Sequence, residues 1–218
     1  EGDRGGQARR VGAPADPGLV RVVGVLALQG DFEAHGAALA RLGIEARPVR
    51  TAEEVRASAG LVLPGGESTT MWKLMEGTGV AAAIVEVARR GDPLFATCAG
   101  VILAARHITR PDRDGLGLLR ATAVRNAYGR QLDSAVVTLT DLDREALGSA
   151  PLEAVFIRAP KLADLGEGVE VLARRDGDPV LVRQGNVVAA TFHPELAADP
   201  RVHRLAFSSV LAAAPAAR

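Results

Sequence analysis

The sequence predicts an α/β fold in which helices flank a doubly wound, mostly parallel central sheet, with antiparallel strands added in the C-terminal half. In the first half, short apolar runs alternate with stretches of helical spacing, as in buried parallel strands joined by crossover helices. In the second half, strand-like runs follow one another across short turns, as in antiparallel sheets. The 218 residues, 48% of them hydrophobic, suffice for one core.

In the first half, each expected strand leads through a turn into a helix. Phe32, His35 and Leu39 recur at helical spacing after the first strand, and Gly43 ends that helix. Thr51 has the character of an N-cap for the next helix. The expected strands cover residues 20–28, 44–50, 60–66 and 93–98, and the expected helices cover residues 32–42, 51–57, 68–75, 81–90 and 99–108.

The second half contains six strand-like runs before a closing helix. The runs cover residues 121–128, 134–140, 153–158, 169–175, 179–184 and 186–192, and the closing helix runs from about Pro200 to Ala213. The first 20 residues are mostly Gly, Pro, Ala and charged residues, which cannot bury enough apolar surface to order themselves. We therefore expect a flexible extension at residues 1–20 and a single domain over residues 21–218.

Charge and composition argue against several partners and sites. Basic and acidic residues number 26 each and aromatic residues make up 3%, so neither nucleic acid nor a membrane is an expected partner. No apolar run approaches the roughly 20 residues that cross a bilayer. The single cysteine, Cys98, excludes an internal disulfide and a four-cysteine zinc site, and it suits a reducing cytoplasm. We expect neither a metal nor a cofactor.

Cys98 lies between small residues at the point where an apolar strand changes into a helix. This is the sequence pattern of a nucleophile elbow, because a sharp turn exposes the side chain at the carboxyl edge of the sheet and crowds the backbone beside it. The N-terminus of the following helix would favour the thiolate. Taken alone, the pattern also fits a buried structural cysteine, the usual situation of a free thiol.

The tripeptide His193-Pro194-Glu195 directly follows the last expected strand. A carboxylate two residues from a histidine can hydrogen-bond one imidazole nitrogen and leave the other to face a thiol, which is the arrangement of a catalytic triad. For the tripeptide alone, a surface turn is the more common explanation. The other histidines fall in expected helices without a carboxylate partner, and we assign them no role; they are His35, His107 and His203.

A glycine-rich turn, Leu63–Thr70, follows another buried strand. Consecutive glycines let backbone N–H groups approach a ligand, so such an N–H and that of Ala99 would form an oxyanion hole. The turn lacks the lysine of a P-loop and the spacing of a dinucleotide motif. Because the cysteine, histidine and glycine motifs each follow a strand, they should converge at the carboxyl edge of one sheet.

With these motifs in place, the chain resembles the class I glutamine amidotransferases, which have a flavodoxin-like sheet, and specifically the glutaminase subunits of pyridoxal 5′-phosphate synthase. The resemblance spans about residues 21–212. Cys98 and the His-Pro-Glu motif carry the general class. Five blocks carry the specific family: Leu26–His35, Leu63–Thr70, Arg125–Ser134, Phe156–Pro160 and Thr191–Leu196.

The resemblance implies that Cys98 is the nucleophile, His193 its base and Glu195 the residue that orients the base. It implies a substrate site for L-glutamine and an oxyanion hole of the Gly66 and Ala99 N–H groups; the substrate residues are Gly66, Glu67, Ser68, Arg125, Ile157 and Arg158. Glutamine carries an α-ammonium group, which suits Glu67, and an α-carboxylate, which suits an arginine. The sequence does not decide between Arg125 and Arg158.

The resemblance also implies that the released ammonia passes to a synthase subunit in a heteromeric complex that makes pyridoxal 5′-phosphate. The turn Gln29–Asp31 would then lie at the docking face and help to set the oxyanion hole. Three alternatives remain at this point: a glutaminase for another synthase, a docking module without catalysis, and a cysteine hydrolase or peptidase on a similar sheet.

Overall fold

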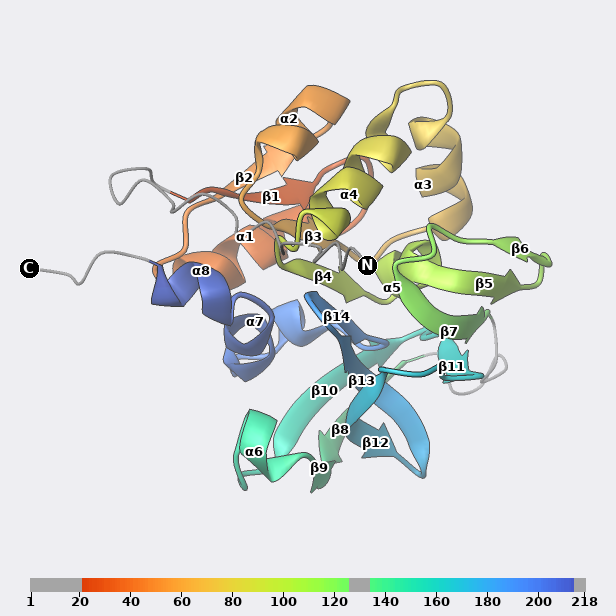
Figure 1. Ribbon diagram of the computed structural model, residues 1–218. Helices are drawn as coiled ribbons and strands as arrows, with labels where there is room; N and C mark the ends of the chain where they lie inside the picture. Colours follow the sequence, from red (N-terminus) through yellow and green to blue (C-terminus); the bar gives the residue numbers. More distant parts are fainter. Residues whose placement is uncertain (1–20, 126–133, 214–218) are drawn as a thin grey trace, which may run out of the picture.

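The computed structural model describes residues 21–125 and 134–213 and builds them around one large sheet (Figure 1). Its strands are β1 Val23–Leu26, β2 Ala46–Val49, β3 Leu61–Leu63, β4 Leu94–Thr97, β9 Asp141–Leu142, β12 Glu170–Arg175, β13 Asp178–Gln184 and β14 Val187–Ala190. They lie in the order β2-β1-β3-β4-β14-β13-β12-β9. The extension expected at residues 1–20 and most of the sequence block at 125–134 fall outside the described residues.

Five neighbouring strands of this sheet are parallel, from β2 to β14. The antiparallel strands β13, β12 and β9 extend it on the β14 side. This arrangement confirms the predicted fold class of a mostly parallel sheet with antiparallel additions. It also places β4, the strand that leads to Cys98, in the interior of the sheet between β3 and β14.

Helices cover both faces of the sheet, because alternate residues of the buried strands point to opposite sides. Val62 and Phe95 belong to one apolar core, whereas Leu63 and Ala96 belong to the other. The first core is covered by α1 Phe32–Ala40, α7 Arg201–Ala206 and α8 Ser208–Ala212; the second is covered by α2 Ala52–Ala57, α3 Ser68–Met75, α4 Val80–Arg89 and α5 Ala99–Ala104. Figure 1 shows α2, α3 and α4 together, away from α7 and α8.

The expectation that all strands of the second half extend the main sheet is wrong for three of them. One small sheet pairs β8 Ser134–Leu139 with β10 Leu152–Ile157, and another joins β5 Ala105–Thr109, β6 Arg113–Asp114, β7 Leu119–Val124 and β11 Lys161–Ala163. Apolar residues of β10 belong to the same core as α1 and α7, so this pair packs against the main sheet instead of joining its edge. Alternating burial is the same in either arrangement, so sequence periodicity cannot distinguish them.

Two expected helices are shorter than predicted. The helix expected at residues 99–108 ends at Ala104, because the chain from Ala105 pairs in parallel with β7. His107 therefore lies on a strand, 3.2 Å from an oxygen of Asp112. The closing helix breaks at Phe207, whose ring is fully buried, into α7 and α8. A short helix that was not predicted, α6 Arg144–Leu147, is capped by the side chain of Asp143.

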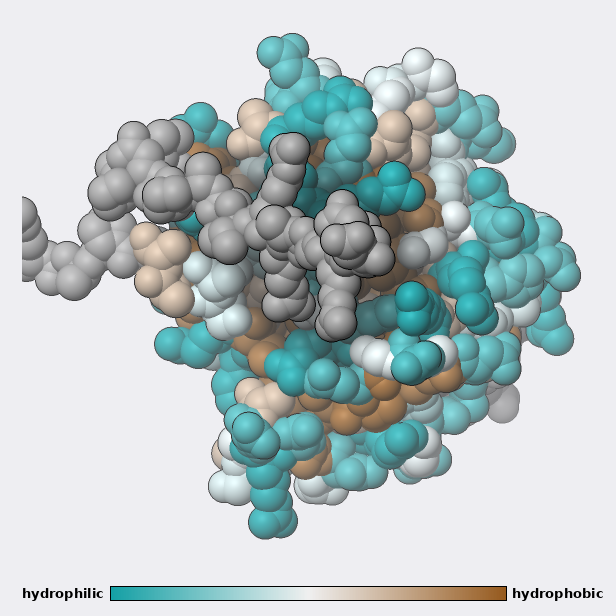
Figure 2. Space-filling view, in the orientation of Figure 1, coloured by the Kyte–Doolittle hydropathy of each residue, from teal (hydrophilic) through white to brown (hydrophobic). Residues whose placement is uncertain are grey.

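The described residues expose few large apolar side chains. The large apolar side chains exposed among the described residues are Leu74, Val136 and Leu196, which lie on three separate elements. Figure 2 shows mostly hydrophilic residues on one face, with a narrow hydrophobic band where β8, β10 and β13 lie in Figure 1. Within residues 21–125 and 134–213, no helix combines the length and apolarity that a membrane crossing requires.

The contact between α5 and β3 gives a test of how tightly the Cys98 turn is built. A Cβ at Gly100 would lie 2.0 Å from the backbone oxygen of Leu63, so Gly100→Ala must push α5 away from the sheet. We expect it to lower the free energy of unfolding by roughly 1–3 kcal/mol, as measured by urea denaturation. The matched control is Gly36→Ala in α1, where a Cβ meets nothing within 4 Å.

The control should be neutral or should stabilise the protein by up to about 1 kcal/mol, because alanine loses less backbone entropy in a helix than glycine does. Equal effects of the two substitutions would contradict close packing of α5 on β3.

Candidate active site

Cys98 occupies the sharp turn between β4 and α5 that its sequence neighbours predict. Its backbone has φ 45° and ψ −105°, a conformation that costs a residue with a side chain of order 1–3 kcal/mol and that tends to occur at functional sites. The Cys98 N–H donates to the oxygen of Ala190 in β14 at 2.9 Å. The thiol lies 3.7 Å from the backbone oxygen of Ile157. The turn therefore fixes the sulfur at the edge of the sheet.

His193 reaches the same edge from the end of β14. Its ring nitrogen Nδ1 lies 2.6 Å from Oε1 of Glu195, within the short 3-10 helix η2 Pro194–Leu196. The backbone N–H of His193 donates to the oxygen of Val155 at 2.8 Å, which fixes the start of this turn. His193 and Glu195 are only 7% and 5% exposed. The carboxylate is therefore in position to orient the imidazole.

The pKa of His193 reflects this arrangement. Burial alone would lower it, but hydrogen bonds to Cys98 and Glu195 and the negative charges of both groups outweigh burial and raise the pKa to about 10. The imidazole thus contacts the thiol on one side and the carboxylate on the other. The imidazole is therefore protonated at neutral pH.

The turn after β3 packs against His193 and depends on two glycines. A Cβ at Gly65 would lie 2.3 Å from Cε1 of His193, so the imidazole rests directly on the Gly65 backbone. Gly66 has φ 152°, in the region that favours glycine, and a Cβ there would lie 2.5 Å from Oε1 of Gln29. Both glycines are therefore required by close contacts with neighbouring groups.

The turn Gln29–Asp31, expected at a docking face, lies against this glycine turn. Oε1 of Gln29 accepts a hydrogen bond from the N–H of Glu67 at 2.6 Å. A Cβ at Gly30 would lie 1.8 Å from the oxygen of Gly65. All three residues of the Gln29–Asp31 turn line the pocket next to Cys98. The turn thus supports the shape of the pocket wall.

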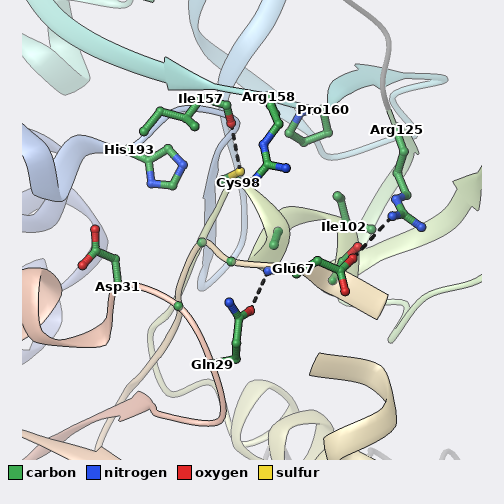
Figure 3. Close-up of a pocket in the computed structure, with 15 residues that line it drawn as sticks. Gln29, Asp31, Glu67, Cys98, Ile102, Arg125, Ile157, Arg158, Pro160 and His193 are labelled. Carbon is green, nitrogen blue, oxygen red and sulfur yellow. Dashed lines mark hydrogen bonds and ion pairs between the residues drawn. The ribbon is translucent and has the colours of Figure 1, made fainter. Parts of the chain in front are cut away.

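Together these segments enclose a pocket of about 380 Å³ (Figure 3). Every residue predicted for the site lines this pocket except Glu195, which lies behind His193. Sequence reasoning missed Ile102 and Pro160 as pocket residues. Their positions carried a signal, because Ile102 lies one helical turn beyond Cys98 and Pro160 ends the block that contains Arg158. No metal-binding cluster of three His, Cys, Asp or Glu residues occurs in the described part of the chain.

The pocket carries opposite charges at separate positions. Glu67 caps α3 by accepting from the N–H groups of Thr69 and Thr70. Slight burial opposes ionisation of Glu67. The hydrogen bonds from these two N–H groups and from the Thr70 hydroxyl outweigh burial and lower the pKa of Glu67 to about 2. Arg125 lies 3.7 Å from the Glu67 carboxylate, while Arg158 is exposed and lies beside Cys98 in Figure 3. The pocket can therefore hold a zwitterion.

One sequence-based interpretation is wrong at this site. His35 was expected to have no carboxylate partner, but its Nε2 lies 3.4 Å from Oε2 of Glu195. His35 comes from α1 and Glu195 follows β14, so their proximity depends on how α1 packs across the sheet. No local spacing could reveal this contact.

Comparison with known proteins identifies the family. A model of the SNO glutamine amidotransferase family matches residues 25–211. The chain belongs to this family. The resemblance inferred from the motifs, and with it the prediction of a glutamine amidotransferase, is confirmed.

Curated relatives of this glutamine amidotransferase carry the name pyridoxal 5′-phosphate synthase subunit PdxT. One from Thermus thermophilus is 53% identical over 185 residues, which cover 84% of this chain and 94% of the relative. One from Koribacter versatilis is 50% identical over 183 residues, covering 84% of this chain and 92% of the relative.

Solved structures agree with this assignment. A crystal structure of a glutamine amidotransferase superposes with a TM-score of 0.79 at 49% identity, over 86% of this chain and 98% of that one. The structure of PurLQS from Thermotoga maritima matches with a TM-score of 0.69 at 17% identity, over 87% of this chain and 98% of that one. The second match bears on the fold alone.

Proposed function

We propose that the chain hydrolyses L-glutamine to L-glutamate and ammonia, with Cys98 as nucleophile, His193 as base and Glu195 as the residue that orients His193. The observation that carries this proposal is the continuous contact from thiol to imidazole to carboxylate at one end of an amino-acid-sized pocket. Such a series activates a thiol for attack on a carbonyl carbon.

The chemistry then follows from the geometry in two steps. The Cys98 sulfur attacks the side-chain amide carbon of glutamine, and the carbonyl oxygen gains charge that the N–H groups of Gly66 and Ala99 stabilise. His193 gives its proton to the amide nitrogen, the C–N bond breaks and ammonia leaves. Water next attacks the thioester while His193 takes its proton, the C–S bond breaks and glutamate is released.

The rest of the pocket selects the amino-acid end of glutamine. The Glu67 carboxylate attracts the α-ammonium group, and an arginine attracts the α-carboxylate. Ser68, Ile157 and the turn containing Gly66 complete the site walls. Arg125 suits the carboxylate less well than Arg158 does, because Arg125 already faces Glu67 and Thr69.

The ammonia is passed, in this proposal, to a pyridoxal 5′-phosphate synthase subunit in a heteromeric complex. The supporting observation is that the curated relatives are named as subunits of that synthase. We further propose that residues 21–218 act as one glutaminase domain and that the protein works in the reducing cytoplasm. A nucleophilic thiolate must stay reduced to turn over.

The direct test measures glutamate formation from glutamine by the purified chain, with and without the synthase subunit. We expect turnover that Cys98→Ala abolishes, because the acyl intermediate forms on the Cys98 sulfur. His193→Asn should lower kcat by at least about 100-fold, since it removes the base. Both variants should still bind the synthase subunit, as measured by analytical ultracentrifugation.

Turnover by folded Cys98→Ala equal to that of the wild type would contradict the proposal. Absence of turnover in every condition, with intact binding to the synthase subunit, would instead favour a docking module.

A second test decides which arginine binds the α-carboxylate. We compare Arg125→Gln with Arg158→Gln in the same assay. Loss of the direct ion pair should raise KM for glutamine about 10- to 100-fold with a smaller change in kcat, because this contact is made in both ground and transition states. We expect the larger effect for Arg158→Gln, since Arg125 is engaged with Glu67. The reverse order would assign the role to Arg125.

A further inference from the structure

Behind the Glu195 carboxylate lies a buried pair of histidines that the proposed mechanism does not use. His35 comes from α1 and His203 from α7, and both are 0% exposed. Nδ1 of His35 lies 3.1 Å from Nε2 of His203, and Nε2 of His35 lies 3.4 Å from Oε2 of Glu195. Buried polar groups are costly unless they are hydrogen-bonded. Which ring nitrogens of His35 and His203 carry a proton therefore decides which hydrogen bonds this pair can donate.

Both rings are neutral at physiological pH. Burial, followed by the neighbouring His203 and His193, holds the pKa of His35 well below its usual value. Burial, helped by the charge of Arg41, lowers the pKa of His203 to about 4. Each ring therefore has one N–H donor and one bare nitrogen acceptor.

The contact with His203 decides the tautomer of His35. If the His35 proton were on Nδ1, the Nδ1–H would donate to His203 and force the His203 proton onto Nδ1, which has no hydrogen-bond partner among the described residues. The bare Nε2 could accept from the Thr97 hydroxyl, but its lone pair would also face the Glu195 carboxylate. A buried N–H without an acceptor is rarer and more costly than an unpaired acceptor. His203 therefore donates from Nε2, and the His35 proton is on Nε2.

The Nε2–H of His35 then faces two oxygen atoms. Oγ1 of Thr97 lies 3.1 Å from the nitrogen, and Oε2 of Glu195 lies 3.4 Å from it. Oε1 of Glu195 is occupied by His193, whereas Oε2 makes no aligned hydrogen bond within the described residues. His35 is therefore the N–H donor beside the free oxygen of a buried carboxylate. The ring of Phe95 packs edge-on against both histidines and fixes their planes, with centroids at 5.9 Å and 5.2 Å.

We propose that His35 is a positioning residue for the triad: its Nε2–H, set by the donor from His203, attracts Oε2 of Glu195 electrostatically, so that Oε1 stays directed at Nδ1 of His193. The inference rests on the triad proposed above. It differs from a packing role because it assigns a function to one particular nitrogen of His35.

The proposal predicts a change in pH dependence. Among the described residues, the titratable groups in contact with the Glu195 carboxylate are His193, which directly precedes η2, and His35 from α1. His203 and Arg41 lie beyond His35, and Cys98 lies beyond His193. The Nε2–H of His35 directs its positive end toward the carboxylate that orients the His193 imidazole. Removing this donor should therefore loosen the carboxylate and the imidazole that it orients, so that Cys98 becomes reactive only at a higher pH.

Two amide substitutions at the same position separate the two nitrogens. His35→Asn places an amide near the position of Nδ1, so it keeps the contact with His203 and loses the donor to Glu195. His35→Gln places an amide near the position of Nε2 and retains that donor. Cys98 is the single cysteine of the chain, so the rate of its alkylation by iodoacetamide reports its reactivity without any need for turnover. Both kcat and this rate are measured from pH 5 to pH 9, with thermal melting as the folding control.

For His35→Asn we expect kcat to fall about 10- to 100-fold with little change in KM, and the acidic limb of the alkylation profile to move to higher pH. His35→Gln should recover most of kcat and keep the wild-type limb. Equal losses in both variants with an unmoved limb would reduce His35 to a packing residue and overturn the proposal, as would wild-type behaviour of both. If His35→Asn does not fold, His203→Leu is used instead, because it removes the donor that sets the tautomer and should shift the limb in the same direction.

Because alkylation of Cys98 does not require glutamine turnover, it tests the role of His35 independently of the proposed glutaminase activity. A wild-type chain that turns over no glutamine would refute the glutaminase proposal. The shift of the acidic limb between the two variants would still decide the role of His35.

Discussion

The site depends on the register of three parallel strands in the middle of the sheet. β4 pairs with β3 through Leu63 and Ala96, and with β14 through Ala190 and Thr97. The chain therefore leaves all three strands at nearly the same level of the sheet edge, where the glycine turn, Cys98 and His193 follow. Because parallel strands end on the same side, residues 65, 98 and 193 need only short turns to meet. The strained backbone of Cys98 is maintained because β14 binds its N–H and the first turn of α5 binds its carbonyl oxygen.

Close contacts on either side of this sheet edge fix the positions of the side chains that lie there. The imidazole of His193 rests on the Gly65 backbone, and α5 lies against the Leu63 oxygen at Gly100. The thiol side of the proposed triad opens into the pocket, whereas the carboxylate side is closed by α1. Burying the carboxylate strengthens its interaction with the imidazole, since water cannot compete for it. The cost of that burial is offset only if its oxygens find donors.

Local sequence signals were sufficient for the sheet core and for most pocket residues, because each signal is a property of a strand end. The apolar run before Cys98, the small residues after it and the position of His193 after a strand all describe local backbone geometry. Features set by tertiary packing were not predictable. The pairing of β8 with β10, the end of α5 at Ala104 and the contact of His35 with Glu195 each depend on which elements lie together across the fold.

The proposed hydrolysis passes through a thioester on Cys98, and trapping this intermediate tests the mechanism at its first step. The chain and its synthase subunit are mixed with isotopically labelled glutamine, quenched in acid during turnover, digested and examined by mass spectrometry. Since the chain has one cysteine, an adduct on the cysteine peptide has a unique location. We expect a glutamyl group on Cys98 that disappears when glutamine is exhausted. Accumulation of glutamate with an unmodified Cys98 peptide at every time point would contradict it.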